Sequence, residues 1–152
     1  MKPFRFRAQA ALDLRQRVET EARKALVTAE EHARLANVRL NEAAHSVGVA
    51  QETLTCAERD GVSGAELRWH QSWIARQRLE VDARRREAAV SAASVDRAVT
   101  SVRAAHKQRR TLERLRDRLL MRHRIEARRH EQRNLDELAG LRFTARAPKG
   151  NT

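Results

Sequence analysis

The chain has 152 residues, of which 34% are charged and only 3% aromatic, with five glycines and two prolines. So few aromatic residues make a compact globular core difficult to build, whereas a balance rich in Ala, Arg, Glu and Leu is typical of long helices and coiled coils. The composition therefore predicts an all-α fold and argues against any sizeable β-sheet.

The chain is strongly basic, with a net charge of +12 and an isoelectric point near 11.4. Such a surface attracts acidic partners, and charge alone does not choose among nucleic acid, an anionic membrane and an acidic protein. The single cysteine, Cys56, argues against a disulfide framework and fits a reducing compartment. Because no secretory signal or membrane-spanning run is evident, we expect a cytoplasmic protein without a transmembrane segment.

Two helical segments are expected, in chain order, on either side of one turn. Pro3 and Pro148 lie near the ends, and the sequence Asp-Gly-Val-Ser-Gly over 60–64 is a turn signal between two long stretches without proline. The predicted elements of this single elongated hairpin over 1–152 are a helix at about 9–59, a turn at 60–64, a second helix at about 65–139 and a disordered tail at 143–152.

The ends of the second helix have recognisable signals. Ser63 or Gly64 is expected to cap its start, and Glu66 supplies a carboxylate in the first turn. Gly140 is where this helix is expected to end, since glycine is common just past a helix C-terminus.

The first helix carries a regular apolar seam. Every seventh residue and the residue three further on form an a/d pattern of a mostly large residue and alanine over about seven heptads. The first set is Leu12, Glu19, Leu26, Ala33, Leu40, Val47 and Leu54, and the second is Arg15, Ala22, Ala29, Ala36, Ala43, Ala50 and Ala57.

The second helix has a matching but interrupted seam. Its apolar positions are Leu67, Ile74, Val81, Ala88, Val95 and Val102, joined by Ala92, Val99, Ala105, Leu112 and Leu119, with breaks at Gln77, Arg84 and Arg109. A short loop forces neighbouring helices to run antiparallel. We therefore expect Leu54 beside Leu67 or Gln71, Leu26 beside Val99, and Leu12 beside Leu112.

The second helix is longer than the first by some twenty residues, or about 30 Å at 1.5 Å per residue. The fold class that follows is a long antiparallel two-helix coiled-coil hairpin whose C-terminal helix overhangs. The overhang, from about 125 to 140, is rich in arginine and also carries Leu135, Leu138 and Leu141. We expect it to bind another molecule.

Both ends of the chain resemble the FliJ family of flagellar type III export proteins. The N-terminal motif is Phe4-Arg5-Phe6 followed by spaced leucines, an arginine and an acidic residue. The C-terminal motif is Leu112-Glu113-Arg114-Leu115, then Glu131 and Leu135-Asp136-Glu137-Leu138-Ala139. Between these motifs, the glycine-containing turn and the segment Trp69 to Ile74 occupy the family's hairpin tip.

The resemblance implies a function, which the heptad periodicity alone does not indicate. Family members resemble the coiled-coil stalk of the rotary ATP synthase gamma subunit, bind a hexameric export ATPase, promote its ring and activity, and link it to the membrane export gate. They also escort export chaperones. This chain would then be a non-enzymatic coupling component with no cofactor, located in the cytoplasm and peripherally at the inner membrane of the flagellar base.

Two binding sites are hypothesised on this basis. The ATPase and its regulator would meet the end that carries the termini, because a basic end is drawn to an acidic ring by long-range steering. The residues assigned to this contact are Phe4, Phe6, Arg116, Arg118, Arg122, Arg124, Leu135, Asp136 and Glu137. The export gate would meet Trp69, Trp73 and Ile74, since tryptophan is enriched among binding hot spots. The alternative is that both tryptophans close the hairpin by packing on Leu54 and Leu67.

Other chemistries have weaker signals. No phosphate-binding loop of the Gly-x-x-x-x-Gly-Lys-Ser/Thr type is present, and no catalytic residues are assigned. His123, Glu126 and His130 share one helical face, but a solvated face is expected there and not a metal site.

Two rival functions stay open. The first is the equivalent stalk of a virulence-type injectisome. The second is a basic coiled-coil nucleic-acid-binding protein, which the arginine tract from Arg103 to Arg133 would serve. The acidic residues within that tract and its lack of stacking aromatics argue against specific nucleic-acid binding. Pairs one turn apart, such as Glu19–Arg23, Glu30–Arg34, Glu80–Arg84 and Asp82–Arg86, explain many charges as a salted helix surface.

Overall fold

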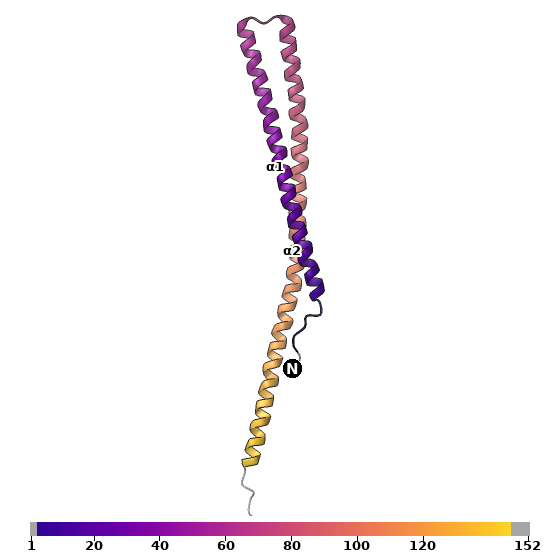
Figure 1. Ribbon diagram of the computed structural model, residues 1–152, viewed down its shortest axis with the longest axis vertical. Helices are drawn as coiled ribbons and strands as arrows, with labels where there is room; N and C mark the ends of the chain where they lie inside the picture. Colours follow the sequence, from indigo (N-terminus) through magenta and orange to yellow (C-terminus); the bar gives the residue numbers. More distant parts are fainter. Residues whose placement is uncertain (1–2, 147–152) are drawn as a thin grey trace, which may run out of the picture. The chain divides into compact units, whose positions relative to one another are not determined.

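A computed structural model describes residues 3–146 and consists of two long helices (Figure 1). The first, α1, spans Gln9–Asp60, and the second, α2, spans Gly64–Arg146. No strand is formed within residues 3–146. The predicted all-α class is confirmed. Neither helix of the described chain is long and apolar enough to cross a membrane.

The C-terminal end of α2 differs from the prediction. The helix continues through Gly140 to Arg146, so the part of the expected tail over 143–146 is helical, and 147–152 lie outside the described residues. A glycine inside a helix costs only about 1 kcal/mol relative to alanine, whereas a proline costs about 3. Leu141 to Phe143 follow without a proline, so the helix does not need to end at the glycine.

The turn between the helices follows its sequence signals. Gly61 has a φ of +90°, a conformation that favours glycine. Ser63 and Glu66 form a reciprocal capping box in which the Glu66 N–H donates to the Ser63 hydroxyl at 3.3 Å and the Ser63 N–H donates to the Glu66 carboxylate at 2.9 Å. Ser63 is therefore the residue that caps α2.

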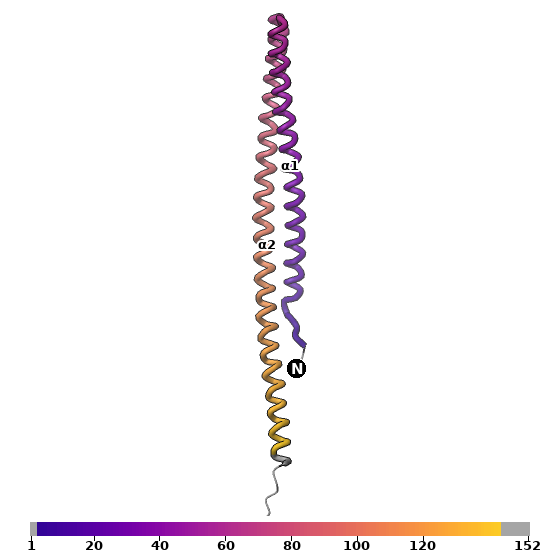
Figure 2. Tube along the Cα trace, turned by 90° about the vertical axis from the view of Figure 1, so that its left-hand side faces the viewer, coloured from indigo at the N-terminus to yellow at the C-terminus, as the bar shows by residue number. Residues whose placement is uncertain are grey.

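Contacts divide the chain into two compact units, and both helices run through both of them. Residues 17–106 form the loop unit, in which α1 and α2 lie side by side and antiparallel (Figure 2). The terminal unit comprises the described residues 3–16 and 107–146.

The seam of α1 is buried as its periodicity indicates. Leu12 is fully buried at 0% exposure, and every other residue of the two predicted sets is buried or half-buried. Three alanines of the second set are among the most buried residues of the described chain, namely Ala36, Ala43 and Ala50. Small side chains at these positions let the two backbones approach closely.

The seam of α2 keeps its spacing of seven but changes its second set. Ile74 and Val81 are buried, whereas Ala92 is exposed and the half-buried residue of that turn is Ser91. Leu119 is 38% exposed, and Leu120 is half-buried in its place. Ser91 lies seven residues after Arg84 and fourteen before Ala105, so it continues their seven-residue series, whereas Ala92 does not.

The observed cross-helix contacts match the predicted register. In the loop unit, Leu54 and Gln71 line the same shallow hollow, which confirms the first expected pair. In the terminal unit, Arg15 donates a 2.8 Å hydrogen bond to Gln108. That pairing is the register in which Leu12 was expected beside Leu112.

Candidate docking surfaces

The N-terminal segment packs against α2 inside the terminal unit. The Gln9 N–H donates to the Phe6 carbonyl at 3.1 Å, so the chain turns into α1 directly after the second phenylalanine. Phe4 meets His123 edge to face, with the ring centroids 5.6 Å apart. Both phenylalanines are half-buried and line a hollow of about 550 Å³ together with Leu115, Leu119 and Arg122.

This packing divides the residues assigned to the ATPase contact into two groups. Phe4, Phe6 and Arg122 surround the hollow and already contact their own chain. Arg116 is half-buried, and its guanidinium lies 3.2 Å from the Asp117 carboxylate. The remaining residues are exposed, namely Arg118, Arg124, Leu135, Asp136 and Glu137.

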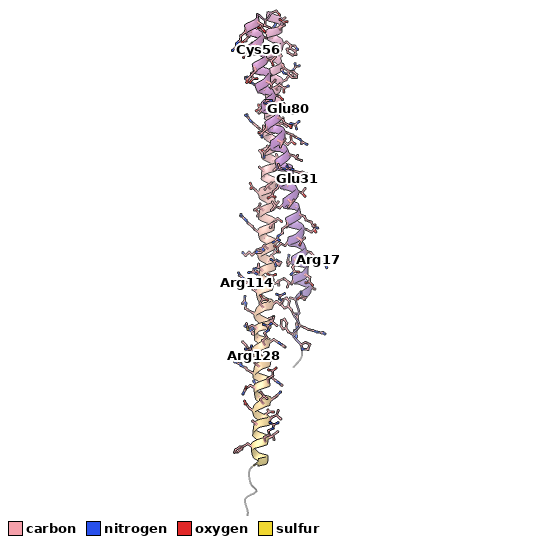
Figure 3. All side chains as sticks on the ribbon, turned by 60° about the vertical axis from the view of Figure 1, so that its left-hand side comes forward. Arg17, Glu31, Cys56, Glu80, Arg114 and Arg128 are labelled. Atoms are coloured by element: carbon pink, nitrogen blue, oxygen red, sulfur yellow. The ribbon has the colours of Figure 1, made fainter. Side chains whose placement is uncertain are left out.

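The overhang begins where the N-terminal segment no longer covers α2. From 128 to 143 every residue of α2 is exposed, and this stretch lies beside no other described segment (Figures 1 and 2). Figure 3 labels Arg128, the first residue of this stretch, and Arg114, which lies further back on α2. Four large apolar residues are among the exposed ones, namely Leu135 at 61%, Leu138 at 53%, Leu141 at 67% and Phe143 at 78%.

The two tryptophans form a second exposed surface, in the loop unit. Their rings are parallel, with centroids 6.2 Å apart, and Trp69 and Trp73 are 57% and 40% exposed. The Arg76 guanidinium lies 5.6 Å from the Trp73 ring centroid. The pair lines a hollow of about 460 Å³ that also includes Val49 and Thr53 of α1.

The residues around this pair can be compared with the two roles expected of the tryptophans, which are a gate contact and packing that closes the hairpin. Leu54 and Leu67, the expected packing partners, are not among the residues of the hollow, and Leu54 lines a separate hollow with Ile74. Ile74 itself is 7% exposed and belongs to the seam. It is therefore not accessible for the gate contact, whereas the tryptophans remain candidates.

Sequence reasoning missed a polar layer inside the seam. Glu19 is only 4% exposed, and its carboxylate lies 2.6 Å from the Arg23 guanidinium and 3.2 Å from His106 Nδ1 on the other helix. The heptad count assigned Glu19 to the seam, but it gave no partner on α2. His106 follows the seam residue Ala105, which is the signal that was available.

A second polar cluster explains why Arg84 is tolerated in the seam. Glu87 accepts from Arg84 at 2.8 Å and from Arg39 of α1 at 3.0 Å, and Arg84 also lies 2.8 Å from Glu80. Hydrogen bonding from Arg84, followed by that from Arg39, lowers the pKa of Glu87, and the same bonding raises the pKa of Arg84. Arg84 is therefore half-buried with its charge paired to Glu80 and Glu87.

Ion pairs along the helices account for part of the charge, though not always in the expected pairing. Glu19–Arg23 and Glu80–Arg84 are confirmed. Arg34 instead pairs with Glu31, and Asp82 pairs with Arg85, each three residues apart. Both spacings bring side chains together on a helix.

The structure also shows the surroundings of Cys56, His123 and His130. Cys56, which precedes the seam residue Ala57, is exposed. His123 packs on Phe4, and His130 lies 3.2 Å from the Asn134 amide nitrogen. Within the described residues, no group of three or more His, Cys, Asp or Glu side chains is placed to hold a metal ion.

The family model for the flagellar FliJ protein matches residues 5–148. No curated protein matches the chain. The structure of a putative YscO homologue from Chlamydia trachomatis is similar with a TM-score of 0.72 at 13% identity, and the match covers 97% of this chain and 100% of that one. A likeness at so low an identity supports the two-helix coiled-coil fold and no more.

Proposed function

The chain belongs to the FliJ family of flagellar type III export proteins, and we propose from this premise that it is the stalk that couples the hexameric export ATPase to the membrane export gate. It binds the ATPase and its regulator, promotes the ATPase ring and its activity, and escorts export chaperones. It carries out no catalysis itself and acts in the cytoplasm, peripherally at the inner membrane. The family match over 5–148 is the observation that carries this proposal.

The terminal unit supplies the ATPase contact in this proposal. Its exposed arginines, such as Arg118 and Arg124, lie on the part of α2 that leads into the uncovered overhang. Long-range attraction to an acidic surface speeds the encounter and orients it, and it weakens as salt rises. Exposed leucines further along the helix supply apolar contact area once the encounter has formed.

Charge reversal tests where the encounter takes place. We expect Arg118→Glu with Arg124→Glu to slow association with the purified cognate export ATPase by about tenfold at low ionic strength. Arg86→Glu with Arg97→Glu is the matched control, because both residues are exposed in the loop unit and the net charge changes equally. Equal slowing by both double variants would locate the effect in total charge and contradict the assignment.

The gate contact belongs, in the same proposal, to the tryptophan pair. Large, half-exposed aromatic side chains on one helical face are the usual anchors of a protein interface. Trp69→Ala with Trp73→Ala is expected to weaken binding to the cytoplasmic part of the export gate about a hundredfold or more, at unchanged helicity. Leu79→Ala, which removes a 68% exposed apolar side chain, serves as the control. A melted hairpin or undiminished binding would contradict the anchor role.

The injectisome stalk remains the alternative within the same class of protein. The family model that matches is the flagellar one, which is why the flagellar assignment is proposed. Activation of an injectisome ATPase, with no effect on a flagellar one, would reverse that choice.

A further inference from the structure

The overhang carries a hole of the kind that receives a side chain in a coiled coil. Leu135, Leu138, Ala139 and Arg142 line a hollow of about 440 Å³ together with Phe143. The first four are spaced i, i+3, i+4 and i+7, which is the four-residue hole into which a facing helix inserts a knob. No other described segment of the chain lies beside this hollow.

Charge on the same face indicates what fills the hole. Glu131 and Arg142 lie on this face, four residues before Leu135 and four after Leu138. Among the described residues, no ion pair within 4 Å is found for either of them. Eleven residues separate them, or about 16 Å along a helix, so they cannot pair within one chain.

We propose that the occupant is a second copy of this chain, bound antiparallel through its own overhang. When Leu135 of each copy faces Leu138 of the other across a two-fold axis, Glu131 falls opposite Arg142 of the second copy, and this happens twice. Leu135 of one copy then enters the hole of the other, so the interface is self-complementary, as a two-fold dimer requires. The inference does not depend on the proposed function.

The remaining charges near the axis do not oppose this arrangement. Arg133, Asp136 and Glu137 would repel their symmetry mates if they lay on the face, but their positions along the helix place them away from it. The Asp136 carboxylate accepts a 2.9 Å hydrogen bond from Gln132. Because the interface is only a few turns long, the dimer is weak and its population depends on concentration.

Sedimentation equilibrium of the full chain tests the dimer. The unaltered chain is expected to pass from monomer to dimer as its concentration rises. Leu135→Glu should weaken dimerisation about a hundredfold, because two apolar knobs are lost per dimer. Leu79→Glu, at a 68% exposed position of the loop unit, should leave dimerisation unchanged. A chain that is monomeric throughout, or a control that also loses the dimer, would overturn the inference.

A charge swap tests the antiparallel pairing itself. Glu131→Arg alone and Arg142→Glu alone should each weaken dimerisation about tenfold, because like charges then face each other twice. Mixed one to one, the two variants should form a heterodimer about as tight as the original dimer, since both facing pairs are again of opposite charge. Failure of the mixture to recover would rule out this register.

The dimer and the proposed activation of the ATPase can be tested separately. A chain that activates the export ATPase through Leu135 but stays monomeric would assign the hole to the ATPase and overturn the dimer. A chain that dimerises as described and leaves the ATPase unaffected would keep the dimer and contradict the proposed function.

Discussion

Glu19 is a buried charge in a seam that is otherwise mostly aliphatic. Removing a carboxylate from water costs several kcal/mol, and its pairing with Arg23 and His106 offsets this cost only in part. Since the contact with His106 joins the two helices, Glu19 fixes one register of the hairpin at the expense of stability.

Replacing Glu19 with an apolar residue is therefore expected to stabilise the hairpin. Glu19→Leu should raise the free energy of unfolding by about 1–3 kcal/mol, because a leucine continues the seam from Leu12 to Leu26. Urea unfolding followed by circular dichroism measures this change. A loss of stability would show that the polar pairing is worth more than apolar packing at this position.

Two carboxylates give the hairpin a dependence on acid pH. Hydrogen bonds from Ser63 lower the pKa of Glu66, and Arg84 does the same for Glu87, each from an ordinary value of 4.5. A pKa that is lower in the folded state stabilises the fold above the unfolded value and loses that effect as pH falls through the folded one. Thermal stability should therefore drop below pH 4.5.

The Ser63 cap separates the contribution of Glu66 from that of Glu87. Ser63→Ala should cost about 1 kcal/mol at neutral pH, because the Glu66 N–H loses its acceptor. The same variant should show a shallower acid loss of melting temperature than the unaltered chain. An identical acid profile would mean that Glu66 does not contribute to it.

At the level of the helices, the alanines of α1 set how closely α2 approaches. Ala43 is 9% exposed, whereas its neighbour Ala44 is exposed. Ala43→Leu should overfill the seam and cost about 1–3 kcal/mol of stability, while Ala44→Leu should change it by less than about 0.5 kcal/mol. Chemical denaturation of both variants provides the comparison, and equal effects would contradict close packing at Ala43.

The first helix was predictable because its signals agree with one another. The seven-residue spacing, the turn residues and the short loop all indicate one antiparallel register, and Leu54 beside Gln71 confirms it. The second helix was less predictable, since polar residues such as Arg84 occupy seam positions, and the Glu87 that pairs with Arg84 is also held by Arg39 of α1. The Arg39–Glu87 contact joins residues 48 positions apart, so the periodicity of one helix does not reveal it.

The sequence indicated which residues could form the candidate sites, but it did not indicate which residues would surround them. Tryptophans one turn apart indicate an anchor, yet their position beside Val49 and Thr53 depends on which face of α1 meets them. Likewise, Phe4 and Phe6 were assigned to a partner, whereas the structure packs them on α2. An extended segment of six residues has no periodicity from which such packing could be inferred.

As a whole molecule, the chain is proposed to activate an ATPase that is a separate protein. The terminal unit offers an exposed, basic overhang, and the loop unit offers an exposed aromatic pair. One chain with two such surfaces is suited to joining two partners.

The most direct test is ATP hydrolysis by the cognate flagellar export ATPase, with and without the chain, at an ionic strength near physiological. We predict that the full chain stimulates hydrolysis together with ring formation, and that a chain truncated after Met121 does neither. Equal stimulation by the truncated chain would contradict the role of the overhang. No stimulation and no association by the full chain would contradict the stalk function itself.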